Sequence, residues 1–219
     1  MASKTAALSD EAVRNLAIQR SRAVKRNNAL TALAAGGTLA VLGARAYGFG
    51  PHDAGIFYGI VAGLLYANLF EYVLHRYLLH WGSGFLAGRH ALHHKSAGTP
   101  EEPRYVNFAT SPWVVVLLFV SNALPVFALE HFLRLGLAPG MLAGFAVYYM
   151  LYEEIHWRMH LGGWLPGWLQ VARHHHMLHH GDFEGRYNVF LPLCDWIFQR
   201  SQWKSSPPGP PTHVSPRSP

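Results

Sequence analysis

Four long apolar segments limit the folds that this chain can adopt. They run over residues 29–47, 54–74, 112–133 and 137–155. A helix needs about 20 predominantly apolar residues to cross the hydrocarbon core of a bilayer, and each segment approaches that length. Charged residues make up 14% of the chain, whereas an ordinary soluble domain has roughly 25%. We therefore predict an all-α, multipass membrane protein with about four transmembrane helices; a buried helical bundle in a soluble protein is the alternative.

The basic residues predict which ends of these helices face the cytoplasm. Four crossings place residues 1–28, the loop 75–111 and the chain after residue 155 on one side of the membrane. The chain has 18 Lys and Arg residues, and all but Arg45 and Arg134 lie on that side. Because cytoplasmic loops carry the excess of Lys and Arg, we expect that side, and with it both termini, to be cytoplasmic.

The two ends of the chain differ in composition from its centre. Residues 1–28 are rich in Lys and Arg and form an expected basic N-terminal arm. Residues 203–219 are rich in Pro and Ser, a composition typical of disordered tails. The membrane domain is therefore expected to occupy residues 29–202. The net charge of +6 is not concentrated in an aromatic-interleaved basic patch, so we predict no nucleic-acid partner.

Most of the 15 histidines are concentrated in four short groups on the predicted cytoplasmic side. The groups are His75 with His80; His90 with His93 and His94; His156 with His160; and His174, His175, His176, His179 and His180. Burying so many polar rings without partners would cost free energy. Since Cys194 is the only cysteine, a metal site here would have to use histidines and carboxylates. We predict a cytoplasmic histidine-rich helical cap that binds metal; a solvated tract that collects metal loosely is the alternative.

The spacing within the groups suits metal ligation from helices. Residues three or four apart share one face of an α-helix, so histidines within each of the last three groups can converge. His75 and His80 are five apart, which is about 140° around a regular helix. They therefore bind different metals, or the helix is distorted between them. More histidines are available than one metal ion can take, which predicts two metals, and imidazole suits Zn, Fe, Cu and Ni alike.

The order of the four histidine groups after membrane spans resembles that of the fatty acid hydroxylase and sterol desaturase superfamily of membrane di-iron enzymes. The likeness covers roughly residues 54–200. Within the superfamily, the stretches EYVLHRYLLH, HALHHK, PRYVNFATSP, YEEIHWRMH and LCDWIF are most similar to the fatty acid 2-hydroxylase branch. The later stretch GDFEGRYNVFLP departs from that branch and has some similarity to carotenoid hydroxylases.

The resemblance implies which histidines bind two iron ions. The ten implied ligands are His75, His80, His90, His93, His94, His156, His160, His176, His179 and His180. His174 and His175 are not ligands under this assignment. Zinc can occupy the same ligands in purified preparations, because imidazole binds both metals.

Five further residues are expected to support the ligands without binding metal themselves. They are Glu71, Glu153, Glu154, His175 and Asp195. Glu71 precedes His75 by about one helical turn, and the two adjacent glutamates come just before His156. Carboxylates in such places commonly orient a ligand imidazole; a solvated helix end is the alternative. Asp195 is expected either to anchor the C-terminal segment or to hydrogen-bond a ligand.

The resemblance also implies a function, namely hydroxylation of a C–H bond of a lipid with O2 and two electrons from an external donor. The donor would be of the ferredoxin or cytochrome b5 type, and the substrate could be a fatty acyl chain, a sphingolipid, a sterol or a carotenoid. A lipid desaturase with the same di-metal centre and a non-catalytic membrane metal-binding protein are the alternatives. A zinc metalloprotease is not favoured, because Trp157 occupies the place of Glu in an H-E-x-x-H motif.

Overall fold

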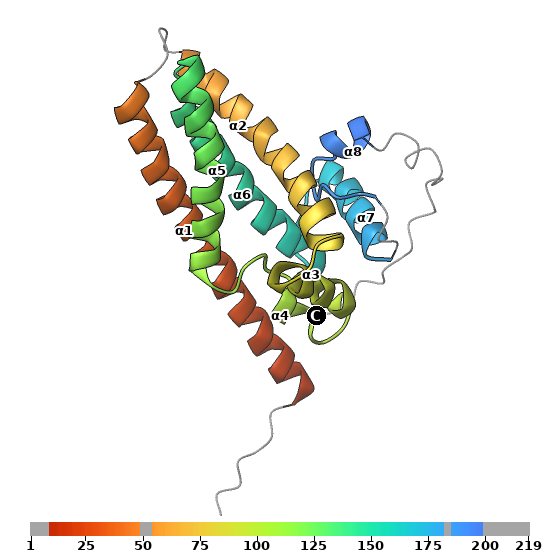
Figure 1. Cartoon of the computed structure of the whole chain (residues 1–219). Helices are drawn as coiled ribbons and strands as arrows, with labels where there is room; N and C mark the ends of the chain where they lie inside the picture. The colour runs from red at the N-terminus through yellow and green to blue at the C-terminus, as the bar shows by residue number, and fades with distance from the viewer. Residues whose placement is uncertain (1–8, 49–53, 182–184, 199–219) are drawn as a thin grey trace, which may run out of the picture.

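The computed structural model of the chain describes residues 9–48, 54–181 and 185–198, and within these ranges every regular element is a helix (Figure 1). The all-α prediction is therefore confirmed. The predicted tail, residues 203–219, lies outside the described residues.

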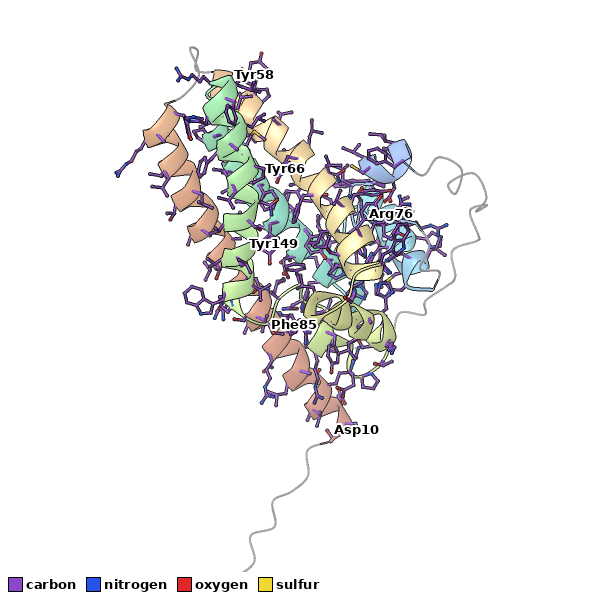
Figure 2. All side chains as sticks on the ribbon, viewed as in Figure 1. Asp10, Tyr58, Tyr66, Arg76, Phe85 and Tyr149 are labelled. Atoms are coloured by element: carbon purple, nitrogen blue, oxygen red, sulfur yellow. The ribbon has the colours of Figure 1, made fainter. Side chains whose placement is uncertain are left out.

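Four long helices form the body of the molecule (Figure 1). They are α1 (Asp10–Tyr47), α2 (Ala54–Val73), α5 (Pro112–Leu133) and α6 (Ala138–Leu161). A π-helix, η1 (Leu74–His80), continues α2 without a break. The remaining helices are short, namely α3 (Phe85–Ser96), α4 (Glu102–Tyr105), α7 (Gly167–Gly181) and α8 (Leu193–Phe198). In Figure 2, Tyr58 near the start of α2, Arg76 of η1 and Phe85 of α3 follow one another in that order from the top of the molecule toward Asp10.

Three of the described helices are long and apolar enough to cross a membrane. They are α1, the continuous helix over residues 55–80, and α5. In the most apolar stretch of each helix, fewer than half of the residues are buried inside the structure, as expected for helices that face lipid. The fourth predicted segment falls in α6, which is not among these three; α6 packs against α1, α2 and α5, and most of its residues are buried.

Glycines bring α2 and α6 into close contact. A Cβ atom added at Gly63 would lie 2.2 Å from the carbonyl oxygen of Met141, and one added at Gly144 would lie 2.4 Å from that of Ile60. Only glycine lets two helix backbones approach this closely. The contact fixes the C-terminal end of α2, and with it η1, beside the C-terminal half of α6.

The N-terminal half of α1 packs against the same body. Ser21 Oγ donates to Asn107 Oδ1 at 2.9 Å and accepts from Trp157 Nε1 at 3.0 Å. The Asn28 side chain donates to the carbonyl oxygen of Ala109 at 2.9 Å. The boundary predicted at residue 28 therefore falls inside a continuous helix, and residues 10–28 of the expected arm are helical and packed.

Candidate metal centre

Ten histidine side chains from four helical segments form two clusters. The first cluster consists of His75, His80, His90, His94 and His179, and the second of His93, His156, His160, His176 and His180. Within each cluster, one ring nitrogen from every member lies within 4.8 Å of those of the other members. The two clusters are adjacent, because the rings of His94 and His180 stack with their centroids 4.3 Å apart. All ten histidines singled out from the sequence are therefore brought together.

Helices α3 and α7 each contribute to both clusters. From α3, His90 and His94 join the first cluster and His93 joins the second; α7 places His179 in the first cluster and its other two members in the second. Spacing alone suggested that each of these groups converges on one point. The difference arises because both helices lie between the two clusters. Histidines on one side of each helix therefore join the first cluster, and those on the other side join the second.

The π-helix η1 explains the five-residue spacing of His75 and His80. Hydrogen bonds in a π-helix join residues five apart, so these two side chains lie on one face, which they would not do in an α-helix. Their Nε2 atoms are 3.3 Å apart, and both belong to the first cluster. The interpretation that the helix is distorted is confirmed, and the interpretation that the two residues belong to different sites is wrong.

Two hydrogen bonds determine where the protons lie in the first cluster. Nδ1 of His75 bonds to the carbonyl oxygen of Tyr187, and Nδ1 of His179 lies 2.8 Å from that of Gly185. A carbonyl can only accept, so in neutral rings both Nδ1 atoms carry the proton and both Nε2 atoms carry a lone pair. These Nε2 atoms are 3.2 Å apart. Two lone pairs repel at this distance unless a cation binds both, so the arrangement fits a metal site.

The second cluster has the same character. His160 Nδ1 lies 2.8 Å from Glu102 Oε1, and its Nε2 lies 2.9 Å from Nε2 of His176. Among the described residues, neither ring nitrogen of His93 has a hydrogen-bond partner, although this side chain is buried. An unpartnered buried imidazole costs free energy. A bound metal ion would remove that cost.

Burial keeps these imidazoles neutral. Burial, as the largest cause, and the neighbouring histidines of the clusters together lower the pKa of His94 and of His180 to about 3 and that of His179 to about 2. The cause is that a charged ring loses its hydration in the interior and is repelled by other charged rings nearby. At neutral pH the rings therefore offer lone pairs, which is the form that binds metal.

An apolar cavity leads from the interior of the helix bundle to the histidines. Side chains of α2, α5 and α6 line it, and it reaches His75. A second cavity, which reaches His93 and other members of both clusters, shares three lining residues with the first, namely Leu79, Phe108 and Tyr152. The Tyr152 ring stacks on His156 with centroids 5.4 Å apart. The two cavities therefore meet beside the clusters, at a largely apolar constriction.

The sequence model of the fatty acid hydroxylase family matches residues 60–200. The chain belongs to the fatty acid hydroxylase family. All ten clustered histidines lie within the matched region.

A solved structure described as full-length Scs7p, with only the hydroxylase domain visible, is similar to this member of the fatty acid hydroxylase family. The TM-score is 0.58 at 21% sequence identity, over 76% of this chain and 62% of that chain. At this identity the likeness concerns the fold. Among curated protein sequences, none matches the chain significantly.

Glu102 is a supporting residue of this hydroxylase-family site that the sequence does not reveal. Its carboxylate orients His160 through the 2.8 Å contact, although the two residues are 58 positions apart. It lies on the short helix α4, outside every histidine group, so no helical periodicity links it to a ligand. The carbonyl groups of Tyr187 and Gly185 were likewise not predicted, because main-chain acceptors have no sequence pattern.

Glu71 and Asp195 act on the ligands indirectly. The Asp195 carboxylate accepts from the backbone N–H groups of Tyr187 and Asn188, each at 2.9 Å. Glu71 Oε1 accepts from the backbone N–H of Val189, also at 2.9 Å. Both carboxylates therefore hold residues 187–189 in place, and the carbonyl group of Tyr187 in this segment bonds His75 of the first cluster. For Asp195, this is the anchoring role expected from the sequence.

Glu153 and Glu154 take partners outside the clusters. Glu153 Oε1 accepts from the side-chain amide of Asn28 at 3.1 Å. Glu154 forms ion pairs with Lys25 and Arg158. Among the contacts of the described residues, neither glutamate bonds a clustered histidine. The contacts with Asn28 and Lys25 join α6 to α1, and the pair with Arg158 lies within α6. These roles differ from the expected one of orienting the imidazole of His156.

The two remaining histidines of α7 lie outside both clusters. His174 is exposed. His175 is buried, with Nε2 3.9 Å from Asp195 Oδ2. This position suits the expected supporting role, because His175 faces the residue that anchors the 187–189 segment.

Proposed function

We propose that the chain is a membrane di-iron enzyme that uses O2 to hydroxylate a C–H bond of a lipid. The observation that carries this proposal is the pair of adjacent clusters of buried, neutral imidazoles at the end of an apolar cavity. Each cluster would hold one iron ion through the five histidines named above, and zinc can take the same places. The family supports a hydroxylase and the ten imidazoles support two bound metal ions, whereas iron and O2 are taken from the resemblance to membrane di-iron enzymes.

Iron, when bound, would supply the activation of O2 and the oxidation of the C–H bond, which amino-acid side chains cannot perform. The chain supplies ligand geometry. Three acceptors each take a hydrogen bond from a proton-bearing Nδ1, namely the carbonyl oxygens of Tyr187 and Gly185 and the carboxylate of Glu102. Each hydrogen bond directs the Nε2 lone pair of the same ring into a cluster. Burial of the rings keeps bulk water away from the reacting atoms.

The lipid chain would enter the apolar cavity over α6, between α2 and α5. Leu118 and Phe145 would contact the distal part of the chain. The carbon to be oxidised would lie where the two cavities meet, beside Leu79, Phe108 and Tyr152. We favour a fatty acyl substrate, as in the 2-hydroxylase branch, because this apolar lining offers few groups that could recognise a polar substrate.

Two electrons must arrive from outside the chain, and we propose a soluble ferredoxin or a cytochrome b5 type donor. The distribution of Lys and Arg supports a cytoplasmic location for the clusters and for both termini. A basic cytoplasmic face would steer an acidic donor toward the site.

Lipid profiling under isotopically labelled O2 tests the proposal. Cells that express the chain should contain a lipid alcohol carrying the label, and cells that express the His160→Ala variant should not. A new double bond without label would identify a desaturase instead. Two bound metal ions without any new product would support the non-catalytic alternative.

A further inference from the structure

A large open cavity lies between α1 and α6, apart from the histidine clusters. Its volume is about 500 Å³. Arg22, Lys25 and Arg26 of α1 line one side, and Met150 and Glu154 of α6 line the other. None of these residues belongs to a cluster or to the cavities that reach one. The proposed reaction therefore does not account for this cavity.

The cavity carries an excess of positive charge. The carboxylate of Glu154 is shared by Lys25 and Arg158, and the other lining acid, Glu153, bonds Asn28. In the part of the chain that the structure describes, Arg22 and Arg26 form no ion pair. Two guanidinium groups are thus left without a counterion, and this group binds phosphate oxygens in bidentate fashion.

Two of the cationic side chains that line the cavity lie over the ring of Trp157. Nζ of Lys25 lies 4.5 Å from the centroid of the Trp157 ring, and Cζ of Arg22 lies 5.4 Å from it. The face of an aromatic ring attracts cations, so the ring offsets part of the repulsion between them. An anion in the cavity would offset the rest.

Exposed apolar side chains continue from the cavity along both helices. On α1, Leu30 and Leu33 follow Arg26 at helical spacing, and they are 58% and 57% exposed. On α6, Val147 and Leu151 precede Glu154 at the same spacing and are also exposed. Residues three or four apart lie on one helix face, so these apolar side chains extend the helix faces that carry Arg26 and Glu154 in the cavity.

The cavity lies where α1 changes from a basic to an apolar helix. Residues 14–26 of α1 carry five basic side chains, and the apolar segment begins at residue 29. Figure 1 shows the N-terminal half of α1 extending beyond the start of α5. For a helix that crosses the membrane, this level corresponds to the lipid headgroups.

We propose that the cavity binds the phosphate of an anionic phospholipid, with Arg22 and Arg26 as its ligands and the acyl chains along the exposed leucines and valine of the two helix faces. A free phosphate would not use these apolar side chains. An acidic protein would need a protruding basic surface rather than a recess at the membrane boundary. The inference requires only that α1 crosses a membrane, and it is independent of the reaction proposed above.

Native mass spectrometry of the detergent-solubilised full chain tests this inference. Titration with dioleoyl phosphatidylglycerol should show one lipid bound about tenfold more tightly than dioleoyl phosphatidylcholine. The Arg22→Gln/Arg26→Gln variant should lose this preference, since each arginine near the surface contributes appreciably to binding of anionic lipid. The Ala23→Trp variant, which narrows the cavity without changing its charge, should also lose it.

Matched controls separate this site from a general effect of charge. The Arg45→Gln/Arg134→Gln variant removes two arginines near the other end of the long helices and should keep the preference. Equal binding of the two lipids by the wild type, or a preference that survives in the Arg22→Gln/Arg26→Gln or Ala23→Trp variant, would overturn the inference. Equally tight binding of water-soluble glycerophosphoglycerol would indicate a free-phosphate site and would also overturn it. The inference would also be overturned if the Arg22→Gln/Arg26→Gln variant lost binding of an acidic electron-transfer protein but kept its lipid preference.

Discussion

Glu102 Oε1 lies 2.8 Å from Nδ1 of His160, and both side chains are almost completely shielded from water. A carboxylate in this position fixes the imidazole tautomer and raises its basicity toward a metal. We predict that Glu102→Ala lowers both metal affinity and product formation roughly 10–100-fold. Glu102→Gln should be milder, because its side-chain oxygen can still accept the hydrogen bond.

The neighbouring acid provides the control for this prediction. Glu101 is exposed and pairs with Arg104, so Glu101→Ala should leave metal content and activity near those of the wild type. Metal analysis of purified variants and product formation by the same preparations measure both effects. Equal behaviour of the Glu101 and Glu102 variants would contradict a role for Glu102 in holding His160.

A second prediction concerns the contact between α2 and α6. A methyl group at Gly63 would overlap the Met141 backbone, which cannot move as a flexible side chain can. Gly63→Ala should therefore destabilise the protein by about 1–3 kcal/mol and lower metal binding in both clusters, since the contact positions η1 against α6. Gly37→Ala is the control, because nothing lies within 4 Å of that position. Thermal melts in detergent with and without metal measure the difference; comparable losses in both variants would contradict the argument.

The sequence predicts the ligands well because each group is local. Helical spacing shows that histidines within a group can converge, and the resemblance to the fatty acid hydroxylase superfamily implies the set of ten that the structure brings together. The division of these histidines between two clusters cannot be predicted in the same way. Whether His93 and His94 face the same metal position depends on how α3 sits between η1 and α6, and spacing within α3 contains no information about that.

The features that the sequence does not predict all depend on contacts between distant segments. The local sequence at His75–His80 does not distinguish a π-helix from an α-helix. The π-helix is needed only because both rings reach the same cluster. The role of Glu102 is evident only from its contact with His160. The role of Glu153 is evident only from its contact with Asn28, which it makes instead of one with the nearby His156. For Glu153 the nearby His156 was the expected partner, and the packing of α1 against α6 selected Asn28 instead.

A third prediction follows from the low pKa values of the buried histidines. The pKa of His180 is about 3 in the folded chain and 6.5 in its ordinary state. Between these values the unfolded chain binds more protons, so folding stability is present above about pH 6.5 and is lost as pH falls below it. Melting temperatures of the metal-free protein should therefore drop between about pH 7.5 and pH 5.

Two variants test that pH dependence. His180→Gln removes one of the buried groups and should make the dependence shallower. His174→Ala removes an exposed imidazole and should leave the profile of the wild type unchanged. A flat profile for the metal-free wild type over this range would show that the buried rings do not govern its stability.

A fourth prediction concerns sidedness. In a Cys194→Ser background, a cysteine at Lys95 should react with a membrane-impermeant maleimide only from the cytoplasmic side. A cysteine at Leu135, in the short connection between α5 and α6, should react only from the opposite side. Both positions are exposed, so accessibility does not limit the reaction. Labelling of the two positions from the same side would contradict the topology on which the cytoplasmic assignment rests.

The five histidines of α7 distinguish a built metal centre from a tract that collects metal loosely. His176 and His180 belong to the second cluster and His179 to the first, whereas His174 and His175 belong to neither. Loss of a ligand imidazole leaves a metal undercoordinated, so alanine at any of the three cluster positions should abolish activity. His179→Ala should chiefly lower occupancy of the first cluster and His176→Ala that of the second, so each should retain roughly one metal ion per chain instead of two.

The other two variants complete the comparison. His174→Ala should match the wild type, and His175→Ala should fall within the roughly 10–100-fold range of residues that support ligands. A loose tract would lose metal by similar steps at all five positions, because its imidazoles are interchangeable. Iron content and product formation measured on the five single variants decide between the two patterns, and equal partial losses across the five would defeat the assignment of His176, His179 and His180 as ligands.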